Sequence, residues 1–364
     1  MSLQVRHAAR HRFRAGRFQR VAALLLVGAL VALPCVAEQP TRLSLRTDAL
    51  TLELTPTLGG RGLLFARHGH ANVLKIGSAV TGQPTPHVDA DADDIAYLGH
   101  DVWLGPQSGW WRDQVVNPAR RDAGANWPPD PWLSFATTRV LAQSERQLEL
   151  EGVSSPVTGV RLRKTFTVVP DRDDSVDVAV TATNIRTQPL TRDLWFNTRT
   201  FADAVVYVPV DRDEDVRVAA DGDPRRAPLQ PMIDDGLLRL QREPIPADMD
   251  GRRGKIFIQP ARGWLAAFVK QQLFLIRFTL QPRNAIHPEQ GQVELYHDDR
   301  REVAEGLLEL EVHAPLRTLA PGESMQAGER WTLLAYSGAA TASEQRAFLC
   351  GEVSRQIGED LCGP

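Results

Sequence analysis

The sequence predicts an all-β fold in which two antiparallel sheets pack face to face, with about sixteen to eighteen strands and one short C-terminal helix. From residue 41 onward, hydrophobic and polar residues alternate in short runs separated by turn residues, a pattern typical of strands with one buried face. Helical periodicity is scarce, and no repeat of roughly 20–50 residues indicates a propeller. The 364 residues, 43% hydrophobic and 24% charged, can bury a large core, and we expect one main domain.

The first 37 residues are predicted to be a secretory signal peptide and not part of that domain. Six arginines between positions 6 and 20 precede thirteen apolar residues at 21–33, and residues 35–37 form a small-x-small cleavage site. The apolar segment is too short to span a bilayer, so an uncleaved anchor is the less favoured alternative. Pro34 directly before Cys35 argues against a lipoprotein. We expect a periplasmic or secreted protein with no stable membrane anchor after cleavage.

Charge and cysteine usage restrict the partners of the mature chain. Cleavage would leave 36 basic and 45 acidic residues, a net charge of −9, which makes nucleic acid an unexpected partner. It would also remove Cys35, and we expect Cys350 and Cys362 to pair with each other in an oxidising compartment. No Gly-x-Ser-x-Gly elbow or glycine loop between strand and helix is present, so neither a serine hydrolase nor a dinucleotide cofactor is expected. No cofactor is expected at all.

The predicted elements follow in order along a main domain at residues 38–340 and a tail at 341–364. The first half contains alternating runs at 43–54, a turn at 57–61, further runs at 62–65 and 72–76, an acidic loop at 77–95, and strands at 146–151, 160–169 and 175–184. After a run at 189–200, residues 211–253 form a charged, proline-rich excursion with one weak strand at 237–240. Strands return at 256–259, 264–270, 273–280, 292–297 and 307–313, a last strand ends near 331–336, and the tail contains the helix at 341–357.

An aromatic stretch at residues 97–132 is the candidate binding surface. Five of the eight tryptophans lie between positions 103 and 132, interleaved with Gly and Pro that neither a long helix nor a regular central strand tolerates. We therefore expect a surface built from loops, where indole faces beside amide and charged groups suit a sugar ring. The alternative is that these rings only plug the end of the β core. The candidate ligands here are Trp103, Gln107, Trp110 and Trp127.

Three short motifs resemble the galactose mutarotase-like group. Gly59-Gly60-Arg61 follows an alternating strand pair, as in the group's N-terminal signature. Trp103-Leu104-Gly105-Pro106-Gln107 with Trp127-Pro128-Pro129, and the segments 308–316 and 319–324, are similar to an uncharacterised bacterial branch of it. The resemblance spans residues 41–337. It implies a large antiparallel β-supersandwich with a sugar cleft on one concave sheet, and a mono- or oligosaccharide as partner.

The resemblance also implies candidate catalytic residues. The group's catalytic Glu lies on a late strand, where Glu311 is the closest match for a general base; spacing puts Glu309 and Glu311 on the face opposite Leu308 and Leu310. The group's catalytic His precedes an aromatic-Phe-Asn run, but here Asp193 takes its place before Trp195-Phe196-Asn197. Aspartate can protonate a ring oxygen only if burial raises its pKa. His100 corresponds to a second, substrate-contacting His.

The remaining candidate ligands come from predicted strands. They are Arg61, Trp195, Asn197, Arg199, Lys270, Glu294, Tyr296 and Glu309. For Glu309 and Glu311 the alternative is a pair of solvated acids on an exposed face. Asp298-Asp299 beside His297 is interpreted as a turn and not as a metal site, because no second clustered ligand pair is evident.

Three functions are compatible with the sequence. The first is an exported carbohydrate-binding protein that has kept a sugar cleft without efficient catalysis. The alternative is an aldose 1-epimerase-like isomerase with Glu311 as base and His100 or Asp193 as acid. The third is an envelope structural domain that uses the sandwich only as a scaffold.

Overall fold

The computed structural model describes residues 40–363 apart from 85–86 and 221. The expected signal peptide and its cleavage site lie outside these residues. In the part of the chain that is described, no helix is long and apolar enough to cross a membrane.

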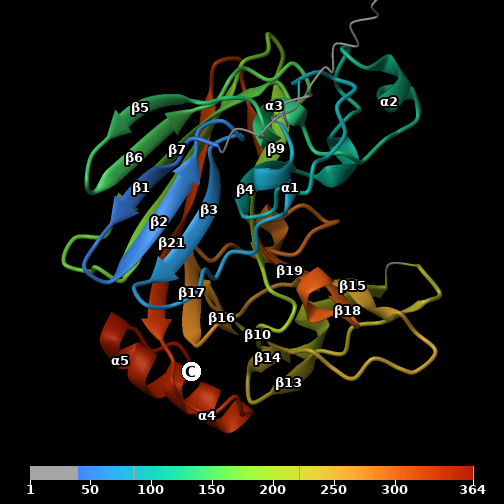
Figure 1. Cartoon of the computed structure of the whole chain (residues 1–364). Helices are drawn as coiled ribbons and strands as arrows, with labels where there is room; N and C mark the ends of the chain where they lie inside the picture. The colour runs from blue at the N-terminus through green and yellow to red at the C-terminus, as the bar shows by residue number, and fades with distance from the viewer. Residues whose placement is uncertain (1–39, 85–86, 221, 364) are drawn as a thin grey trace, which may run out of the picture. The chain divides into compact units, whose positions relative to one another are not determined.

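A sheet of 11 strands carries the features on which function depends (Figure 1). In spatial order its main strands are β1 (Leu43–Arg46), β2 (Leu50–Thr55), β3 (Arg61–Arg67), β4 (His100–Gly105), β9 (Leu190–Thr200), β19 (Leu307–His313), β18 (Val293–Arg300), β15 (Gly251–Ile258) and β11 (Val216–Ala220). Two short strands join its side: β20 (Arg317–Leu319) pairs with β9, and β12 (Arg226–Ala227) runs parallel to β15. Neighbours on the main path are antiparallel.

A second sheet of 10 strands packs against the first. Its spatial order is β13 (Met232–Asp234), β14 (Leu237–Leu240), β10 (Val205–Pro209), β16 (Trp264–Val269), β17 (Gln272–Phe278), β21 (Ser324–Ala335), β8 (Ser175–Asn184), β7 (Val160–Val168), β6 (Gln147–Glu151) and β5 (Arg139–Gln143). The predicted all-β, two-layer class is therefore confirmed. The described residues contain 21 strands, more than expected, because several edge strands are too short to show an alternating pattern.

The core lies between the two sheets and follows from side-chain alternation. On β8, Val176, Val178 and Val180 are buried, as their spacing predicts, and they join one cluster with Phe196 of β9 and Ile256 of β15. Burying each such side chain stabilises the fold by roughly 1.5–3 kcal/mol. Because alternate residues of the larger sheet enter this core, their neighbours in sequence must face the opposite side.

The tail covers the outer face of the second sheet. Helix α4 (Ala342–Ala347), a π-helical turn at Phe348–Val353 and α5 (Ser354–Ile357) form the predicted C-terminal helix, which lies beside β16 and β17 (Figure 1). A disulfide joins Cys350 to Cys362. Leu349 and Val353 pack on Trp264 and Phe268, and the Trp264 indole N–H donates to the carbonyl of Leu361 at 3.1 Å.

Three sequence interpretations need correction. The aromatic stretch is not wholly loop, since Trp103 lies on β4, which pairs with β9 along its whole length; the one-turn helices α1 (Ala79–Gly82), α2 (Pro118–Asp122) and α3 (Pro131–Ser134) flank it. The 211–253 excursion supplies β11 to β14 and the start of β15, and therefore extends both sheets. Asp298 and Asp299 belong to strand β18 and not to a turn.

Candidate functional site

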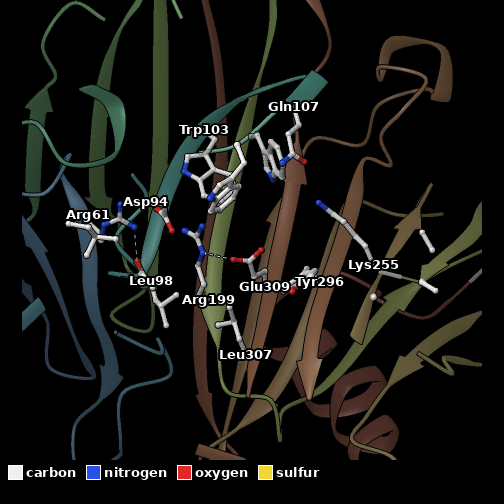
Figure 2. Close-up of a pocket in the computed structure, with 17 residues that line it drawn as sticks. Arg61, Asp94, Leu98, Trp103, Gln107, Arg199, Lys255, Tyr296, Leu307 and Glu309 are labelled. Atoms are coloured by element: carbon white, nitrogen blue, oxygen red, sulfur yellow. Dashed lines mark hydrogen bonds and ion pairs between the residues drawn. The ribbon is translucent and has the colours of Figure 1, made fainter. Parts of the chain in front are cut away.

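The outward face of the larger sheet forms the floor of a cavity of about 450 Å³ (Figure 2). Four side chains lie in one row across four neighbouring strands, because Arg199, Glu309, Tyr296 and Lys255 are paired in register. Eight of the residues proposed as ligands line this cavity: Arg61, Trp103, Gln107, Trp127, Trp195, Arg199, Tyr296 and Glu309. The structure thus brings together residues from five segments that are far apart in sequence.

Three indoles form the aromatic wall. Trp103 and Trp195 are register partners on β4 and β9, and their rings meet edge to face at 5.1 Å between centroids. Trp127 lies 6.2 Å from Trp103 and is 50% exposed. Trp110 does not line the cavity; it supports the wall from behind, at 5.3 Å from Trp103 and 5.7 Å from Trp195. The wall is therefore a packed cluster with one accessible ring at its edge.

Ion pairs hold the charged side chains of the cavity. Arg199 donates from Nε to Glu309 at 2.9 Å, and its guanidinium lies 4.5 Å from the centre of the Trp103 ring (Figure 2). Arg61 donates to Asp101 at 2.8 Å and to the carbonyls of Leu98 and Ser134 at 2.7 and 2.8 Å. These contacts fix both guanidinium groups, so a ligand meets preoriented donors.

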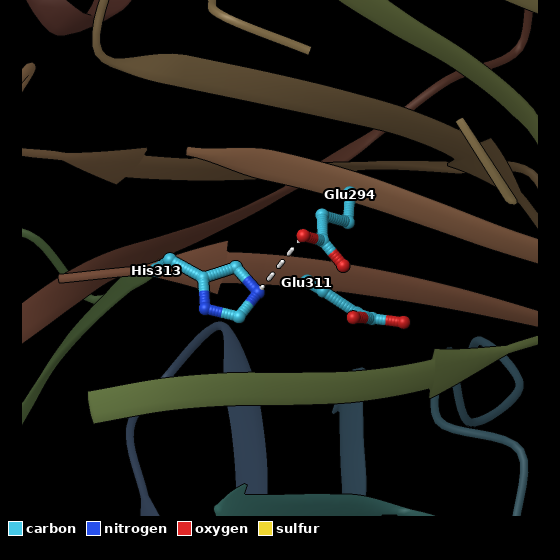
Figure 3. A group of neighbouring side chains, drawn as sticks. All are labelled: Glu294, Glu311 and His313. Atoms are coloured by element: carbon cyan, nitrogen blue, oxygen red, sulfur yellow. Dashed lines mark ion pairs between the residues drawn. The ribbon is translucent and has the colours of Figure 1, made fainter. Parts of the chain in front are cut away.

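A buried charge cluster contacts Trp195. Figure 3 shows three of its members, Glu294, Glu311 and His313. Lys255 places its ammonium 2.6 Å from Glu294 Oε2 and 2.8 Å from Glu311 Oε2. Trp195 Nε1 also donates to Glu311 at 2.8 Å. His313 Nε2 lies 3.5 Å from Glu294 Oε1, and its ring stacks near Trp195 at 4.8 Å.

Burial and pairing set the protonation of this cluster. Burial, reinforced by the charges of Glu294 and Glu309 and opposed by Lys255, raises the pKa of Glu311 to about 8. For Glu294 the penalty of burial is outweighed by His313 and Lys255, which lower its pKa to about 2. For His313 burial is likewise outweighed, and Glu294 and Asp193 raise its pKa to about 9. At neutral pH the cluster holds a charged imidazolium and an ionised Glu294, and Glu311 holds its proton more tightly than an ordinary carboxyl group does.

The same cluster has the composition of a metal site. Ligand atoms of Glu294, Glu311 and His313 lie within 4.8 Å of one another, and carboxylate with imidazole suits several divalent ions. However, the Lys255 ammonium already bonds both carboxylates. The chain therefore supplies its own cation, and the donor set does not fit an added metal ion.

The three candidate catalytic residues do not line the cavity. Glu311 and Asp193 are fully buried beneath it, and Asp193 accepts from the backbone N–H of Gly105 at 3.1 Å. His100 faces the core, because it shares a side of β4 with Val102 and Leu104; its ring meets Trp331 at 4.6 Å and contacts Thr198 Oγ1 at 2.9 Å. The structure therefore places His100 in the core and not among the residues that line the cavity.

Three further candidates lie away from the cavity wall. Asn197 is buried beneath the cavity beside Glu311, its register partner. Glu294 belongs to the charge cluster. Lys270 occupies the turn between β16 and β17, 3.7 Å from Asp203, and is absent from the cavity lining, so its expected role as a hydroxyl ligand is not supported by position.

Sequence reasoning missed Lys255, Asp94 and His313. Lys255 directly precedes the predicted strand at 256–259, and the observed strand β15 includes it. Period two then places Lys255 opposite the core residue Ile256. His313 follows Glu311 by two residues and shares its face. Asp94 lines the cavity from the acidic loop that was interpreted as solvated.

The comparisons with known proteins concern the fold. A family model described as a domain of unknown function, DUF4380, matches residues 41–334. No curated protein matches the sequence. The solved Slr1438 protein from Synechocystis sp. PCC 6803 is similar with a TM-score of 0.54 and 12% identity, over 82% of this chain and 98% of that chain.

A galactose mutarotase-like protein from Lactobacillus casei ATCC 334 gives a TM-score of 0.52 and 10% identity, over 80% of this chain and 100% of that chain. At such identities the likeness shows the fold alone. The expected galactose mutarotase-like fold is confirmed.

Proposed function

This chain belongs to the DUF4380 family, and from that premise we propose that it is an exported protein that binds a mono- or oligosaccharide with little or no efficient catalysis. The observation that carries the proposal is the cavity wall, which combines Trp103, Trp127 and Trp195 with the Arg199–Glu309 pair. Indoles pack against the C–H faces of a sugar, while a fixed guanidinium and carboxylate donate to and accept from its hydroxyls. We expect affinities of about micromolar to millimolar, because a few such contacts contribute only several kcal/mol.

The position of Glu311 argues against efficient anomer interconversion. A general base must come within about 3 Å of the proton that it takes. Glu311 is fully buried, is covered by Trp195, and bonds Lys255. His100 faces the core, and Asp193 is fully buried. These features support a binding cleft.

A second candidate function, an aldose 1-epimerase-like isomerase, is favoured by one observation. His313 carries a pKa raised by Glu294 and Asp193, against the effect of burial, to about 9, so it holds a proton at neutral pH close to Glu311. If Trp195 moved and a sugar entered the space beneath it, the sugar would meet a proton donor, His313, and a carboxyl group, Glu311, at the same place.

Titration against a saccharide panel tests binding. Wild-type protein is titrated by calorimetry, and Trp127→Ala is expected to weaken the best ligand at least about tenfold, because stacking area is lost. Trp127 is half exposed, so its removal costs little stability. Trp132→Ala is the matched control, since Trp132 is a partly buried indole that does not line the cavity. A folded wild type that binds no saccharide at millimolar concentration would contradict the proposal.

Polarimetry on freshly dissolved α-glucose and α-galactose separates the two candidates. We expect mutarotation far slower than an efficient epimerase produces, and Glu311→Gln should remove any enzymatic remainder. A fast rate abolished by Glu311→Gln or His313→Gln would favour the isomerase instead. Export is tested independently by intact-mass analysis of periplasmic protein, which should give an N-terminus near Glu38.

A further inference from the structure

We propose that Asp94 makes this cavity select neutral saccharides over uronic acids, an inference that rests on the saccharide binding proposed above. It names the ligand class that the site accepts. Three independent features of the structure carry it: the pairing of every other charge in the cavity wall, the anchoring of the loop that presents Asp94, and the donors beside it.

The charged groups in the cavity wall are paired except for Asp94. Arg61 pairs with Asp101, Arg199 with Glu309, and Lys255 with both Glu294 and Glu311. Among the described residues, no group makes a hydrogen bond or an ion pair with the Asp94 carboxylate. Lys164 also bonds Asp101, at 3.1 Å. The cations of the wall are therefore engaged, and Asp94 is the carboxylate of the described wall that a ligand meets without a bonded partner.

The loop that presents Asp94 is anchored by α2. Arg120 of α2 donates to the carbonyls of Ala90, Ala92 and Asp91 at 3.0, 3.1 and 3.1 Å. Asn117 donates to Ala90 O at 2.8 Å and to the Asp91 carboxylate at 2.9 Å. Arg120 itself lies 4.5 Å from the centre of the Trp111 ring. These bonds hold the loop, so the position of Asp94 is set before a ligand arrives.

The partners that Asp94 lacks are hydrogen-bond donors. Burial raises the pKa of the Asp94 carboxyl, with the positive charges of Arg61 and Arg199 opposing the shift. A partly desolvated carboxylate gains most when hydroxyl groups donate to it. Figure 2 shows Asp94 between Arg61 and Arg199. A pair of neighbouring sugar hydroxyls can therefore donate to Asp94 and accept from Arg199.

A uronic acid carries a carboxylate that the acidic side chains of this wall repel. Its carboxylate would enter a wall where Asp94 and Glu309 already present negative charge, and like charges a few ångströms apart repel in a partly desolvated site. The guanidinium and ammonium groups that could neutralise it are already bonded to acidic side chains. Binding of the acid would require one of these pairs to break.

Matched sugar pairs test the selection. Glucose against glucuronate, galactose against galacturonate and mannose against mannuronate are titrated by calorimetry at pH 7 into the wild type, Asp94→Asn and Asp93→Asn. For the pair whose neutral sugar binds most tightly, the wild type should bind that sugar at least about tenfold more tightly than the corresponding uronate. Asp94→Asn should reduce this ratio about tenfold, with the uronate bound more tightly and the neutral sugar more weakly.

Two variants separate charge from position. Asp93→Asn removes the same charge one residue away. The Asp93 side chain is 90% exposed and bonds Arg120 at 3.1 Å, but Arg120 keeps its contacts with three backbone carbonyls of the loop, so the ratio should not change. Arg120→Gln keeps Asp94 and loosens its loop, and should lower neutral-sugar affinity several-fold. Circular dichroism verifies that each variant is folded.

The outcomes are distinguishable. A wild type that prefers the uronate, or a ratio unchanged by Asp94→Asn, overturns the role of Asp94 and leaves saccharide binding standing. If no sugar of the panel and no larger saccharide binds, both proposals are overturned.

Discussion

Buried ionisable side chains occur on both faces of the larger sheet, and they differ in how they are satisfied. Beneath the cavity, Lys255, Glu294, Glu311 and His313 contact one another. In the core on the other side, His100 has Thr198 as its polar partner, at 2.9 Å. Glu329 of β21 lies among apolar side chains as well and accepts from Trp331 Nε1 at 2.7 Å.

The pKa shifts follow this difference. Pairing outweighs burial for Lys255 and His313 and raises the pKa of both. Glu311 differs, because burial together with the charges of Glu294 and Glu309 raises its pKa to about 8 although Lys255 bonds it. Burial dominates for the isolated groups: it lowers the pKa of His100, aided by the charge of Lys164, and raises the pKa of Glu329 to about 8. The comparison shows that a buried side chain on the cavity face stays charged only because it contacts a side chain of opposite charge.

Removing the shared cation should have the largest effect. Lys255→Met leaves the buried Glu311 without its cation and Glu294 with only the His313 imidazolium, and we expect the free energy of unfolding at pH 7 to fall by about 3–5 kcal/mol. Urea denaturation measures it. Lys270→Met is the control, since that lysine makes an exposed pair at 3.7 Å, and it should change stability by less than about 0.5 kcal/mol.

A second substitution tests the same pairing. Adding Glu311→Gln to Lys255→Met replaces the carboxyl group that has lost its cation, and should restore part of the lost free energy of unfolding. If Lys255→Met lowers the free energy of unfolding no more than Lys270→Met does, the stability of the fold does not depend on the ion pairs of this cluster.

Glu329 should make stability depend on pH. Because its native pKa of about 8 exceeds the ordinary value of 4.5, the native state keeps a proton that the unfolded state loses, so stability falls as pH rises from 4.5 to 8. Glu329→Gln keeps an acceptor for Trp331 and should remove the share of this fall that comes from Glu329, giving a gain of roughly 2–4 kcal/mol at pH 8. The fall caused by Glu311 and His313, whose native pKa values are also raised, should remain.

Urea denaturation at pH 5 and pH 8 provides the measurement for Glu329→Gln. Glu145→Gln, at an exposed loop position, should leave the pH profile unchanged. If Glu329→Gln and the wild type show the same change in stability between pH 5 and pH 8, Glu329 does not hold a proton in the native state at pH 8.

His100 should show the smallest effect. His100→Leu alone leaves the buried Thr198 hydroxyl without its partner and should cost about 1–3 kcal/mol, whereas His100→Leu with Thr198→Val removes both partners and should be nearly neutral. Neither variant should change saccharide affinity, because both side chains face the core. Loss of binding in the folded double variant would place His100 in the site after all.

The strands were largely predictable because alternation is a local signal. Strand β19 matches its predicted range of 307–313, and the opposite orientation of Glu309 and Leu308 follows directly from period two. The same rule assigns His100 to the core once β4 is recognised as a strand. Glycines and prolines around Trp103 concealed that strand, and the resemblance to a family histidine then favoured the wrong face.

The site was only partly predictable, because its assembly depends on register between distant strands. Nothing local to Lys255 indicates that Glu294 and Glu311 lie within 2.8 Å of its ammonium. The role of the 211–253 excursion was also not predictable. Ala219 and Ala220 of β11 line the cavity, but this short edge strand lies among charged residues and shows no alternation of hydrophobic and polar residues. Whether a charged residue is solvated or enclosed is decided by partners far away in sequence.

The disulfide-strapped tail has a practical consequence for handling this protein. Trp264, Phe268 and Leu273 face away from the main core and are covered by Leu349 and Leu361 of the tail. A recombinant chain truncated before residue 341 would carry a contiguous apolar surface in water, and such surfaces drive self-association. In a reducing cytosol the Cys350–Cys362 disulfide would not form, and the tail would be held less firmly on the second sheet. Aggregation there would indicate that the outer face of this sheet is exposed and not that the cavity is misfolded.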